Sequence, residues 1–284
     1  MGQRRKMSHN RQKKIAVIND FCGFGRCSLA VSIPIISAMK LQCCPLPTAL
    51  FSNHTGFPSF YSEDFTPHME RYIEEWKKLD LRFEAILSGF LGSAEQTEIV
   101  SRFFEHFKTE SNTVVVDPVM GDNGKLYPGY SRELADKMSS LLCFADILTP
   151  NLTEATILTG EEYDEKISDA GLLSIAKRLS DMGPRKVVIS GISRGDDLIN
   201  FVYEKGVGHE IITEHKVGIC RSGTGDVFSS VIAADAVRGI GFSDSVRHAS
   251  AFIAKVLRKT AELGIPKTDG IAFEEFLDEL ITEK

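Results

Sequence analysis

The 284-residue sequence contains no run of about 18 apolar residues, the length that a membrane-spanning helix requires. It also has no excess of positive charge, since 33 Lys and Arg residues are outnumbered by 39 Asp and Glu residues and the formal net charge is -6. This balance gives no general attraction for nucleic acid or for anionic lipid. We therefore expect neither a membrane nor a nucleic acid as a partner.

Cysteine pairs with the spacing of a metal site are missing as well. The six cysteines include no Cys-x2-Cys pair and have no histidines at a matching distance, which argues against a structural zinc site. Scattered thiols are typical of a reducing compartment, so we expect a cytoplasmic protein. The basic segment MGQRRKMSHNRQKK has no apolar core like that of a signal peptide. We expect residues 1–13 to be a disordered basic leader and residues 14–284 to form one domain.

The familiar glycine motifs of nucleotide sites are incomplete. CGFGRCS follows a predicted strand, but Ser28 stands where a dinucleotide-binding loop has its third glycine, and no suitable acid follows about 20 residues later. No glycine loop is followed by Gly-Lys-Ser/Thr, which excludes a Walker phosphate loop. A nucleotide would have to bind by another route.

Apolar runs and segments with helical spacing alternate along the chain. KKIAVIND, EAILSGF, TVVVDPV and RKVVISG predict strands that are buried on both faces, with helices between them. LINFVYE and HEIITEHK, joined by KGVG, predict a hairpin at a sheet edge. This order indicates an α/β fold with a mainly parallel sheet and helices on both faces. Ligands collect at the carboxyl ends of such strands, so we expect NDFCGFGR, SGF, DPVMGDNGKLY and TPNLTE to share one crevice.

The motif SGTGD stands directly before an apolar helix. The backbone N–H groups of Gly223, Thr224 and Gly225 would form a concavity for the charge on a transferring phosphoryl group. Asp226 could then accept the proton of an attacking hydroxyl. A glycine-rich turn in which Asp226 is only a first-turn helix charge is the alternative.

Two further acidic motifs have both a functional and a structural interpretation. Asp117 and Asp122 in DPVMGDNGKLY are candidates for orienting magnesium-bound phosphate, although Asp-Asn-Gly is also a common turn. Asn151 and Glu154 lie three residues apart at a helix start and so share one face. A capping box there competes with a role in magnesium binding.

FSNHTGF combines aromatic rings, an amide, a histidine and a hydroxyl, which would suit a flat heteroaromatic ligand. The phenylalanines could equally belong to the core, and a single histidine such as His54 is more often structural. Together, GTGDVFSS, DPVMGDNGKLY, LTPNLTEATILTG and FSNHTGF resemble the ribokinase-like superfamily, and specifically its pyridoxal (vitamin B6) kinases, over residues 14 to about 262.

The resemblance implies a Rossmann-like three-layer α/β/α sandwich, ATP as phosphoryl donor, Mg²⁺, and transfer to the 5′-hydroxymethyl group of a B6 vitamer. It also implies a homodimer, and a monovalent cation is a further candidate cofactor. Asp226 matches the catalytic base, and Gly223 and Gly225 match the anion hole. The remaining matches are, for ATP and its metal, Asp117, Asp122, Tyr127, Asn151, Glu154 and Ser190, and, for the vitamer, Phe51, Thr55, Phe90 and Ser222.

One position departs from the resemblance. Where many of these kinases have a serine that contacts the pyridine ring, this sequence has Asp20. A carboxylate would favour a protonated ring nitrogen or a cationic amine, which predicts a preference for pyridoxamine over pyridoxal. Two alternatives remain: a hydroxymethylpyrimidine kinase of the same superfamily, which FSNHTGF disfavours, and a non-catalytic vitamer-binding protein, which the presence of Asp226 disfavours.

Overall fold

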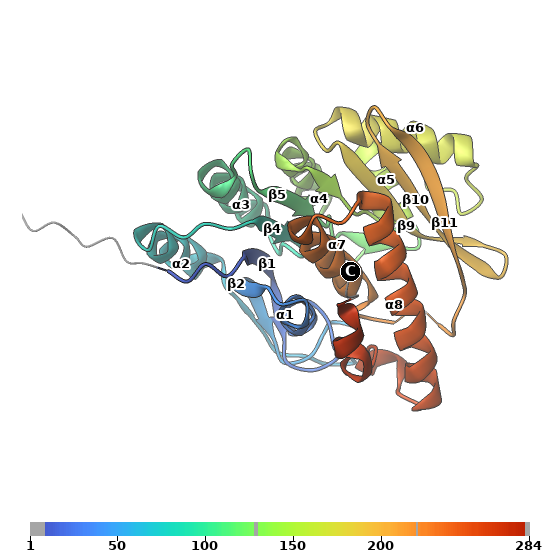
Figure 1. Cartoon of the computed structure of the whole chain (residues 1–284), viewed down its shortest axis with the longest axis horizontal. Helices are drawn as coiled ribbons and strands as arrows, with labels where there is room; N and C mark the ends of the chain where they lie inside the picture. Colours follow the sequence, from blue (N-terminus) through green and yellow to red (C-terminus); the bar gives the residue numbers. More distant parts are fainter. Residues whose placement is uncertain (1–8, 128–129, 220, 282–284) are drawn as a thin grey trace, which may run out of the picture.

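The computed structural model describes residues 9–127, 130–219 and 221–281. The strands of its main sheet are β1 (Lys14–Cys22), β2 (Gln42–Phe51), β3 (Ser62–Asp64), β4 (Ala85–Ser88), β5 (Thr113–Val116), β8 (Ile147–Leu148), β9 (Lys186–Arg194), β10 (Asp197–Glu204) and β11 (Gly208–His215). They lie in the order β11-β10-β9-β8-β5-β4-β1-β2-β3 (Figure 1). All neighbours from β9 to β2 pair in parallel, whereas β3 and the β10–β11 hairpin pair antiparallel. The hairpin occupies one edge, as predicted.

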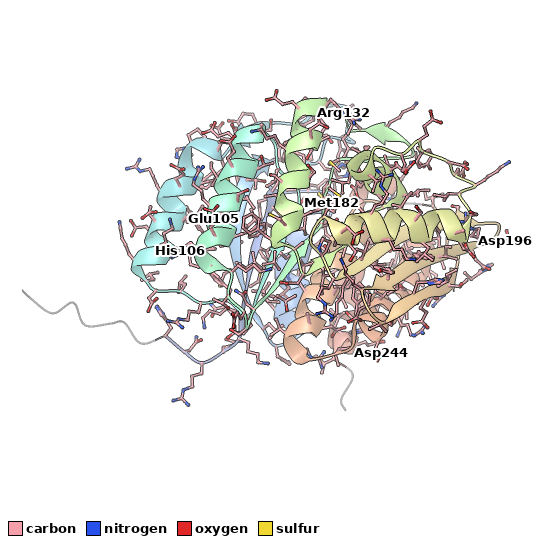
Figure 2. The ribbon with its side chains drawn as sticks, turned by 90° about the horizontal axis from the view of Figure 1, so that it is seen from above. Glu105, His106, Arg132, Met182, Asp196 and Asp244 are labelled. Carbon is pink, nitrogen blue, oxygen red and sulfur yellow. The ribbon has the colours of Figure 1, made fainter. Side chains whose placement is uncertain are left out.

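Helices cover both faces of the sheet. They are α1 (Leu29–Ala38), α2 (Thr66–Lys78), α3 (Ala94–Phe107), α4 (Arg132–Met138), α5 (Leu152–Thr159), α6 (Asp169–Asp181), α7 (Thr224–Arg238) and α8 (Phe242–Glu262), with 3-10 turns at Ser139–Phe144, Lys267–Asp269 and Phe273–Leu280. Residues of α2 to α6 share one core cluster, and residues of α1, α7 and α8 share the other. Figure 2 shows part of the first layer, where α3 with Glu105 and His106 lies beside α4, which begins at Arg132.

The strands are buried on both faces because their side chains alternate between these two clusters. On β1, Ala16 and Ile18 pack with the α2–α6 layer, while Ile15 and Val17 pack with α1, α7 and α8. An uninterrupted apolar run is what such a strand requires. The predicted three-layer α/β/α sandwich with a mainly parallel sheet is therefore confirmed.

The sequence reasoning missed β2, because Pro45 and Pro47 argue against a strand. The Gln42 N–H donates to the Lys13 carbonyl, next to β1, so the even-numbered residues of this part of β2 direct their backbone nitrogens toward β1. The odd-numbered residues, which include Pro45 and Pro47, direct theirs away from it. On that side β3 pairs only with residues 49–51. The missing N–H groups therefore leave no ladder bond unmade.

The ends of the described chain bear on two further expectations. Residues 1–8 of the predicted basic leader lie outside the described residues. His9 hydrogen-bonds to the Leu79 carbonyl at 2.8 Å and the Lys13 ammonium donates to the Val237 carbonyl at 2.8 Å, so contacts with the body begin before residue 14. Among the helices that the structure describes, none has both the length and the apolar character to cross a bilayer.

Candidate active site

Four carboxyl groups from separate parts of the chain lie near one another at the carboxyl edge of the sheet. Asp20 lies two residues before the end of β1, Asp117 follows β5, Glu154 is in the first turn of α5 and Asp226 is in the first turn of α7. The charge of Asp226 acts on both Asp20 and Asp117, and the charge of Asp117 acts on Glu154. The topology therefore brings these carboxyl groups, three of them from the predicted polar segments, together at one edge of the sheet.

The start of α7 is open toward solvent at Gly225 and closely packed at Gly223. Gly223 caps the helix at φ 87°, and a Cβ there would lie 2.2 Å from the Arg26 carbonyl oxygen. A Cβ on Gly225 would meet no described atom within 4 Å. The first-turn N–H groups of Thr224 and Gly225, which have no acceptor within a helix, therefore lie beside open space at Gly225.

Asp226 is held at this helix start by donors from the neighbouring β1–α1 segment. The Asn19 amide donates to its Oδ1 at 3.2 Å. Burial raises the pKa of Asp226, and hydrogen bonds from the Ser28 backbone and the Asn19 side chain oppose that rise. A carboxylate with a raised pKa and fixed orientation is suited to accept a proton from a hydroxyl.

Asp20 is 6% exposed and accepts a hydrogen bond from the Ser28 hydroxyl at 2.6 Å. Burial raises the pKa of Asp20 to about 7, and the nearby charge of Asp226 acts in the same direction. Ser28 adopts φ 58° and ψ -136°, a conformation that side chains rarely tolerate. This strained backbone directs the Ser28 N–H toward Asp226 and its hydroxyl toward Asp20.

Asp117 and Glu154 form the metal candidates. Burial raises the pKa of Asp117 to about 8, with a further contribution from the charge of Asp226. Burial, and then the charge of Asp117, raise the pKa of Glu154 well above its ordinary value. Glu154 already accepts from the backbone N–H of Met120 at 3.1 Å and of Asn151 at 2.8 Å. Within the described ranges, no three His, Cys, Asp or Glu side chains are grouped closely enough to hold a metal by themselves.

The competing structural interpretation of TPNLTE is realised. Asn151 Oδ1 accepts from the Glu154 N–H at 2.9 Å, which completes a capping box at the start of α5. The other end of the Asn151 amide donates to the Gly121 carbonyl at 2.8 Å, and Ser190 pairs with Asn151 as an isolated bridge. The cap therefore joins the ends of β8 and β9 to the segment after β5.

DNGKLY forms a small two-stranded ribbon, β6 (Gly121–Asp122) and β7 (Lys125–Leu126), that the sequence reasoning left as a loop. Asn123 and Gly124 have φ 51° and 74°, the pattern of a two-residue hairpin turn. The Gly124 N–H donates to Thr153 Oγ1 at 2.9 Å, and the Tyr127 N–H to the Met120 carbonyl at 2.9 Å. Asp122 accepts from its neighbour Asn123 and lies beside the α5 cap. We interpret this ribbon as a lid that would exclude water from the site.

The predicted ring-contacting residues gather near Asp20. The Phe51 and Phe90 rings meet edge to face with centroids 6.2 Å apart. Thr55 is exposed in the turn that follows β2. Ser222 donates to the Gly25 carbonyl at 3.0 Å, and its hydroxyl oxygen lies 3.3 Å from His54 Nε2. These aromatic and polar residues are the candidates for contacting a substrate ring.

A segment that the sequence reasoning did not use ties these loops together. We call residues 266–270 the carbonyl strap. The side chains of Arg221, His54 and Arg26 approach the Pro266, Thr268 and Asp269 carbonyls at 2.7, 2.7 and 3.0 Å, respectively. A Cβ on Gly270 would lie 2.6 Å from the Gly25 carbonyl oxygen, so the strap lies directly against the β1–α1 loop. Asn19, Ser28 and the strap are the parts of the site that no motif revealed.

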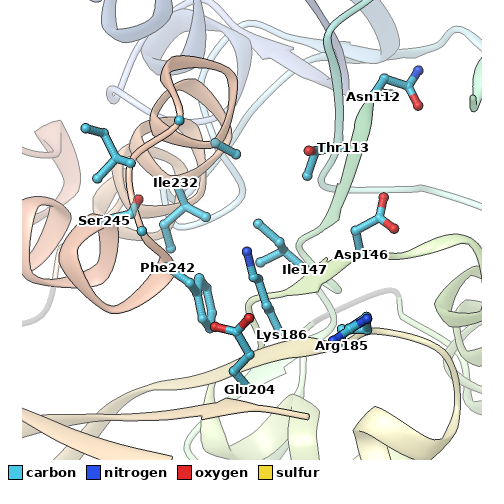
Figure 3. A pocket seen from close by; sticks show the side chains of 14 residues that line it. Asn112, Thr113, Asp146, Ile147, Arg185, Lys186, Glu204, Ile232, Phe242 and Ser245 are labelled. Carbon is cyan, nitrogen blue, oxygen red and sulfur yellow. The ribbon is translucent and has the colours of Figure 1, made fainter. Parts of the chain in front are cut away.

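A cavity of about 480 Å³ lies at the opposite end of the sheet (Figure 3). Asn112 and Thr113 border it before or at the start of β5, and Lys186 at the start of β9. Since it includes none of the predicted site residues, we assign the chemistry to the carboxyl edge instead.

Known proteins resemble this chain in sequence and in fold. The family model of phosphomethylpyrimidine kinase matches residues 37–270. A crystal structure of a proposed phosphomethylpyrimidine kinase from Bacteroides thetaiotaomicron is 38% identical, with a TM-score of 0.95 over 98% of this chain and 97% of that one. A second crystal form of that protein, with pyridoxal, has a TM-score of 0.93 over 96% of this chain and 97% of that one, at 38% identity.

Named pyridoxal kinases are also similar. The enzyme from Actinobacillus pleuropneumoniae is 28% identical over 248 residues, which cover 82% of this chain and 84% of that one. The structure of pyridoxal kinase from Lactobacillus plantarum is 26% identical, with a TM-score of 0.88 over 94% of this chain and 96% of that one. The resemblance to the pyridoxal kinases, expected from four motifs, is thereby confirmed. With its match over residues 37–270, the chain belongs to the phosphomethylpyrimidine kinase family, within the ribokinase-like superfamily.

Proposed function

We propose that the protein transfers the terminal phosphoryl group of ATP to the 5′-hydroxymethyl group of a vitamin B6 vitamer, namely pyridoxal, pyridoxine or pyridoxamine. Such an activity would feed the salvage of pyridoxal 5′-phosphate. The observation that carries the proposal is Asp226 in the first turn of α7, held by Asn19 beside the open N–H groups at Gly225. The similarity to named pyridoxal kinases and to a structure with pyridoxal supports the choice of substrate.

In this proposal the hydroxyl oxygen of the vitamer attacks the terminal phosphorus of ATP, ADP leaves, and Asp226 accepts the proton of the hydroxyl. The N–H groups at the start of α7 stabilise the negative charge on the transferring group. Phe51 and Phe90 hold the ring, and Asp20 faces its polar substituents. Asp226 is oriented before the substrate arrives, so little reorganisation accompanies the proton transfer.

For the nucleotide, we propose that Asn151, Ser190 and the β6–β7 ribbon with Asp122 and Tyr127 flank the phosphates. Magnesium would supply charge neutralisation on those phosphates when bound. Asp117 and Glu154 are the carboxyl candidates for holding it; the Glu154 oxygens accept backbone N–H groups, and the Asp117 carboxyl interacts with the Ser229 and Thr149 side chains. ATP, Mg²⁺, a monovalent cation, a homodimer and a cytoplasmic location are parts of the proposal that rest chiefly on the resemblance.

A hydroxymethylpyrimidine kinase is the second candidate, because the matching family model is described as phosphomethylpyrimidine kinase, which acts on the same substituted pyrimidine in its phosphorylated form. A plant bifunctional enzyme of thiamine biosynthesis from Arabidopsis thaliana is 26% identical over 248 residues, which cover 84% of this chain and 45% of that one. Both candidates use a flat ring with a hydroxymethyl group, so the proposed proton acceptor and anion hole serve either reaction.

The test is ADP release by the purified protein with Mg-ATP and, separately, pyridoxal, pyridoxine, pyridoxamine, hydroxymethylpyrimidine and ribose. We expect turnover that depends on a B6 vitamer and that falls by roughly 10²- to 10⁴-fold in Asp226→Asn. Turnover with hydroxymethylpyrimidine alone would replace the substrate but keep the mechanism. Vitamer-dependent turnover that survives Asp226→Asn would remove Asp226 from its role.

A further inference from the structure

Asn19 is a buried amide at the carboxyl end of β1, and its side chain lies between Asp226 and the ring site. Only 4% of the residue is exposed. A buried amide without partners is costly, so its hydrogen bonds define how the group is oriented.

Two backbone donors determine which end of the amide faces Asp226. Asn19 Oδ1 accepts from the Phe90 N–H at 2.9 Å and from the Asp20 N–H at 3.0 Å. Because a backbone N–H can only donate, the oxygen must face these two groups and the NH₂ must face the other way. That NH₂ donates to Asp226 Oδ1 at 3.2 Å. The orientation of the amide is therefore fixed by the network.

Gly89 provides the space that the amide occupies. A Cβ on Gly89 would lie 2.6 Å from Asn19 Nδ2 and 2.7 Å from its Cγ. Gly89 directly precedes Phe90, whose ring packs against Phe51. One side chain thus contacts both the carboxylate of the proposed base and the segment that forms the wall of the ring site.

We propose that Asn19 is a positioning residue that fixes the Asp226 carboxylate relative to the wall of the substrate ring site. This inference rests on the proposed function for the identity of the substrate. The other donors to the Asp226 carboxylate are the backbone N–H groups of Ser28 and of Asp226 itself, which no substitution removes. The charge of Asp226 acts on the Asp20 and Asp117 carboxyls and on the Cys22 and Cys27 thiols, and none of these groups carries a positive charge that would replace the Asn19 donor.

Asn19→Asp separates this role from a purely structural one. The substitution keeps the volume and the acceptor for the Phe90 and Asp20 N–H groups, but replaces the donor that faces Asp226 with an oxygen. We expect kcat to fall about 10²-fold, the typical cost of a misplaced catalytic group, with little change in the KM values for vitamer and ATP. An amide that only holds the backbone would leave kcat unchanged in this variant.

Asn112→Asp is the matched control. Asn112 is also buried, at 8% exposure, and its amide accepts from the Thr109 N–H and donates to the Phe107 carbonyl, both at 2.8 Å. It lies at the opposite end of the sheet from Asp226. We expect Asn112→Asp to show the stability cost of the same chemical change while kcat and KM stay near those of the unmodified protein.

A second readout does not depend on turnover. The ¹³C chemical shift of the Asp226 carboxyl carbon, assigned by its loss in Asp226→Asn, should change in Asn19→Asp and not in Asn112→Asp. If Asn19→Asp does not fold, Asn19→Ser also removes the donor to Asp226; because it removes the acceptor of the Phe90 and Asp20 N–H groups as well, it is compared with Asn112→Ser, which loses the same two kinds of hydrogen bond. Should the unmodified protein turn over no vitamer, the proposed function fails, and the carboxyl shift still decides the role of Asn19. An unchanged Asp226 carboxyl shift in Asn19→Asp, or an unchanged kcat in this variant of an active enzyme, would overturn the proposed role of Asn19.

Discussion

The two glycines of the GTGD segment should respond in opposite ways to the same methyl group. In Gly223→Ala the new Cβ would lie 2.2 Å from the Arg26 carbonyl oxygen, and the residue would keep a left-handed conformation at φ 87°. The conformation alone costs about 1–2 kcal/mol, and the overlap adds to that. In Gly225→Ala the Cβ meets no described atom within 4 Å. A helical Gly→Ala change there gains up to about 1 kcal/mol of stability.

Activity should not follow stability. The Gly225 methyl group would stand in the space through which we expect the phosphoryl group to approach, so Gly225→Ala should be at least as stable as the unmodified protein and much less active. Urea unfolding curves give the two stabilities, and ADP release with each vitamer gives the activity. A Gly225→Ala variant that retains full kcat would refute a close approach of phosphate to this helix start, and a destabilised one would refute the packing argument.

Further substitutions test the neighbouring groups. Asp20→Asn should reduce a preference for pyridoxamine over pyridoxal, measured as the ratio of the two kcat/KM values, and equal ratios before and after would contradict the assigned contact. In the folded protein Asp20 and Asp117 keep their protons up to pH about 7 and about 8, whereas in the unfolded chain they release them near pH 4. The free energy of unfolding should therefore fall as the pH rises from about 4 to about 8. Asp117→Asn should weaken this fall in urea titrations at several pH values, and an identical pH dependence would contradict the burial of its proton. Thr153→Val removes the acceptor of the Gly124 N–H and should raise ATP hydrolysis relative to vitamer phosphorylation; an unchanged ratio would argue against a lid role for the ribbon.

Sequence patterns predicted the parts of the fold that depend on local regularity. The buried strands and the edge hairpin follow from apolar runs and from their alternation with segments of helical spacing. β2 was missed because its two prolines argue against a strand that is paired on both sides. In the structure the side of β2 toward which these prolines direct their nitrogens is largely unpaired, so they break no hydrogen bond of the sheet. Which side of a strand is hydrogen-bonded to a neighbour depends on the tertiary structure and cannot be predicted from the local sequence.

The site could be predicted where the residue types and spacing of a motif indicate a chemical role. GTGD and TPNLTE identified residues that the structure places together, although TPNLTE also forms the capping box that was its structural alternative. Asn19 stands beside a predicted site residue, yet a lone asparagine has no motif, and its role depends on contacts with Phe90 and Asp226 far along the chain. The strained Ser28 was equally hidden, because its conformation is imposed by the surrounding fold and not by its sequence neighbours.

The carbonyl strap also has a consequence for biosynthesis. The ribosome makes a chain from its amino end, and parts of a domain can fold before the rest is made. Arg26, His54 and Arg221 all precede residues 266–269, whose carbonyls accept their hydrogen bonds. A nascent chain can therefore assemble the central sheet while these three side chains still lack their acceptors. The loops around the ring site are held in place only after the strap has left the ribosome, which delays a complete substrate site until nearly all of the kinase fold has been made.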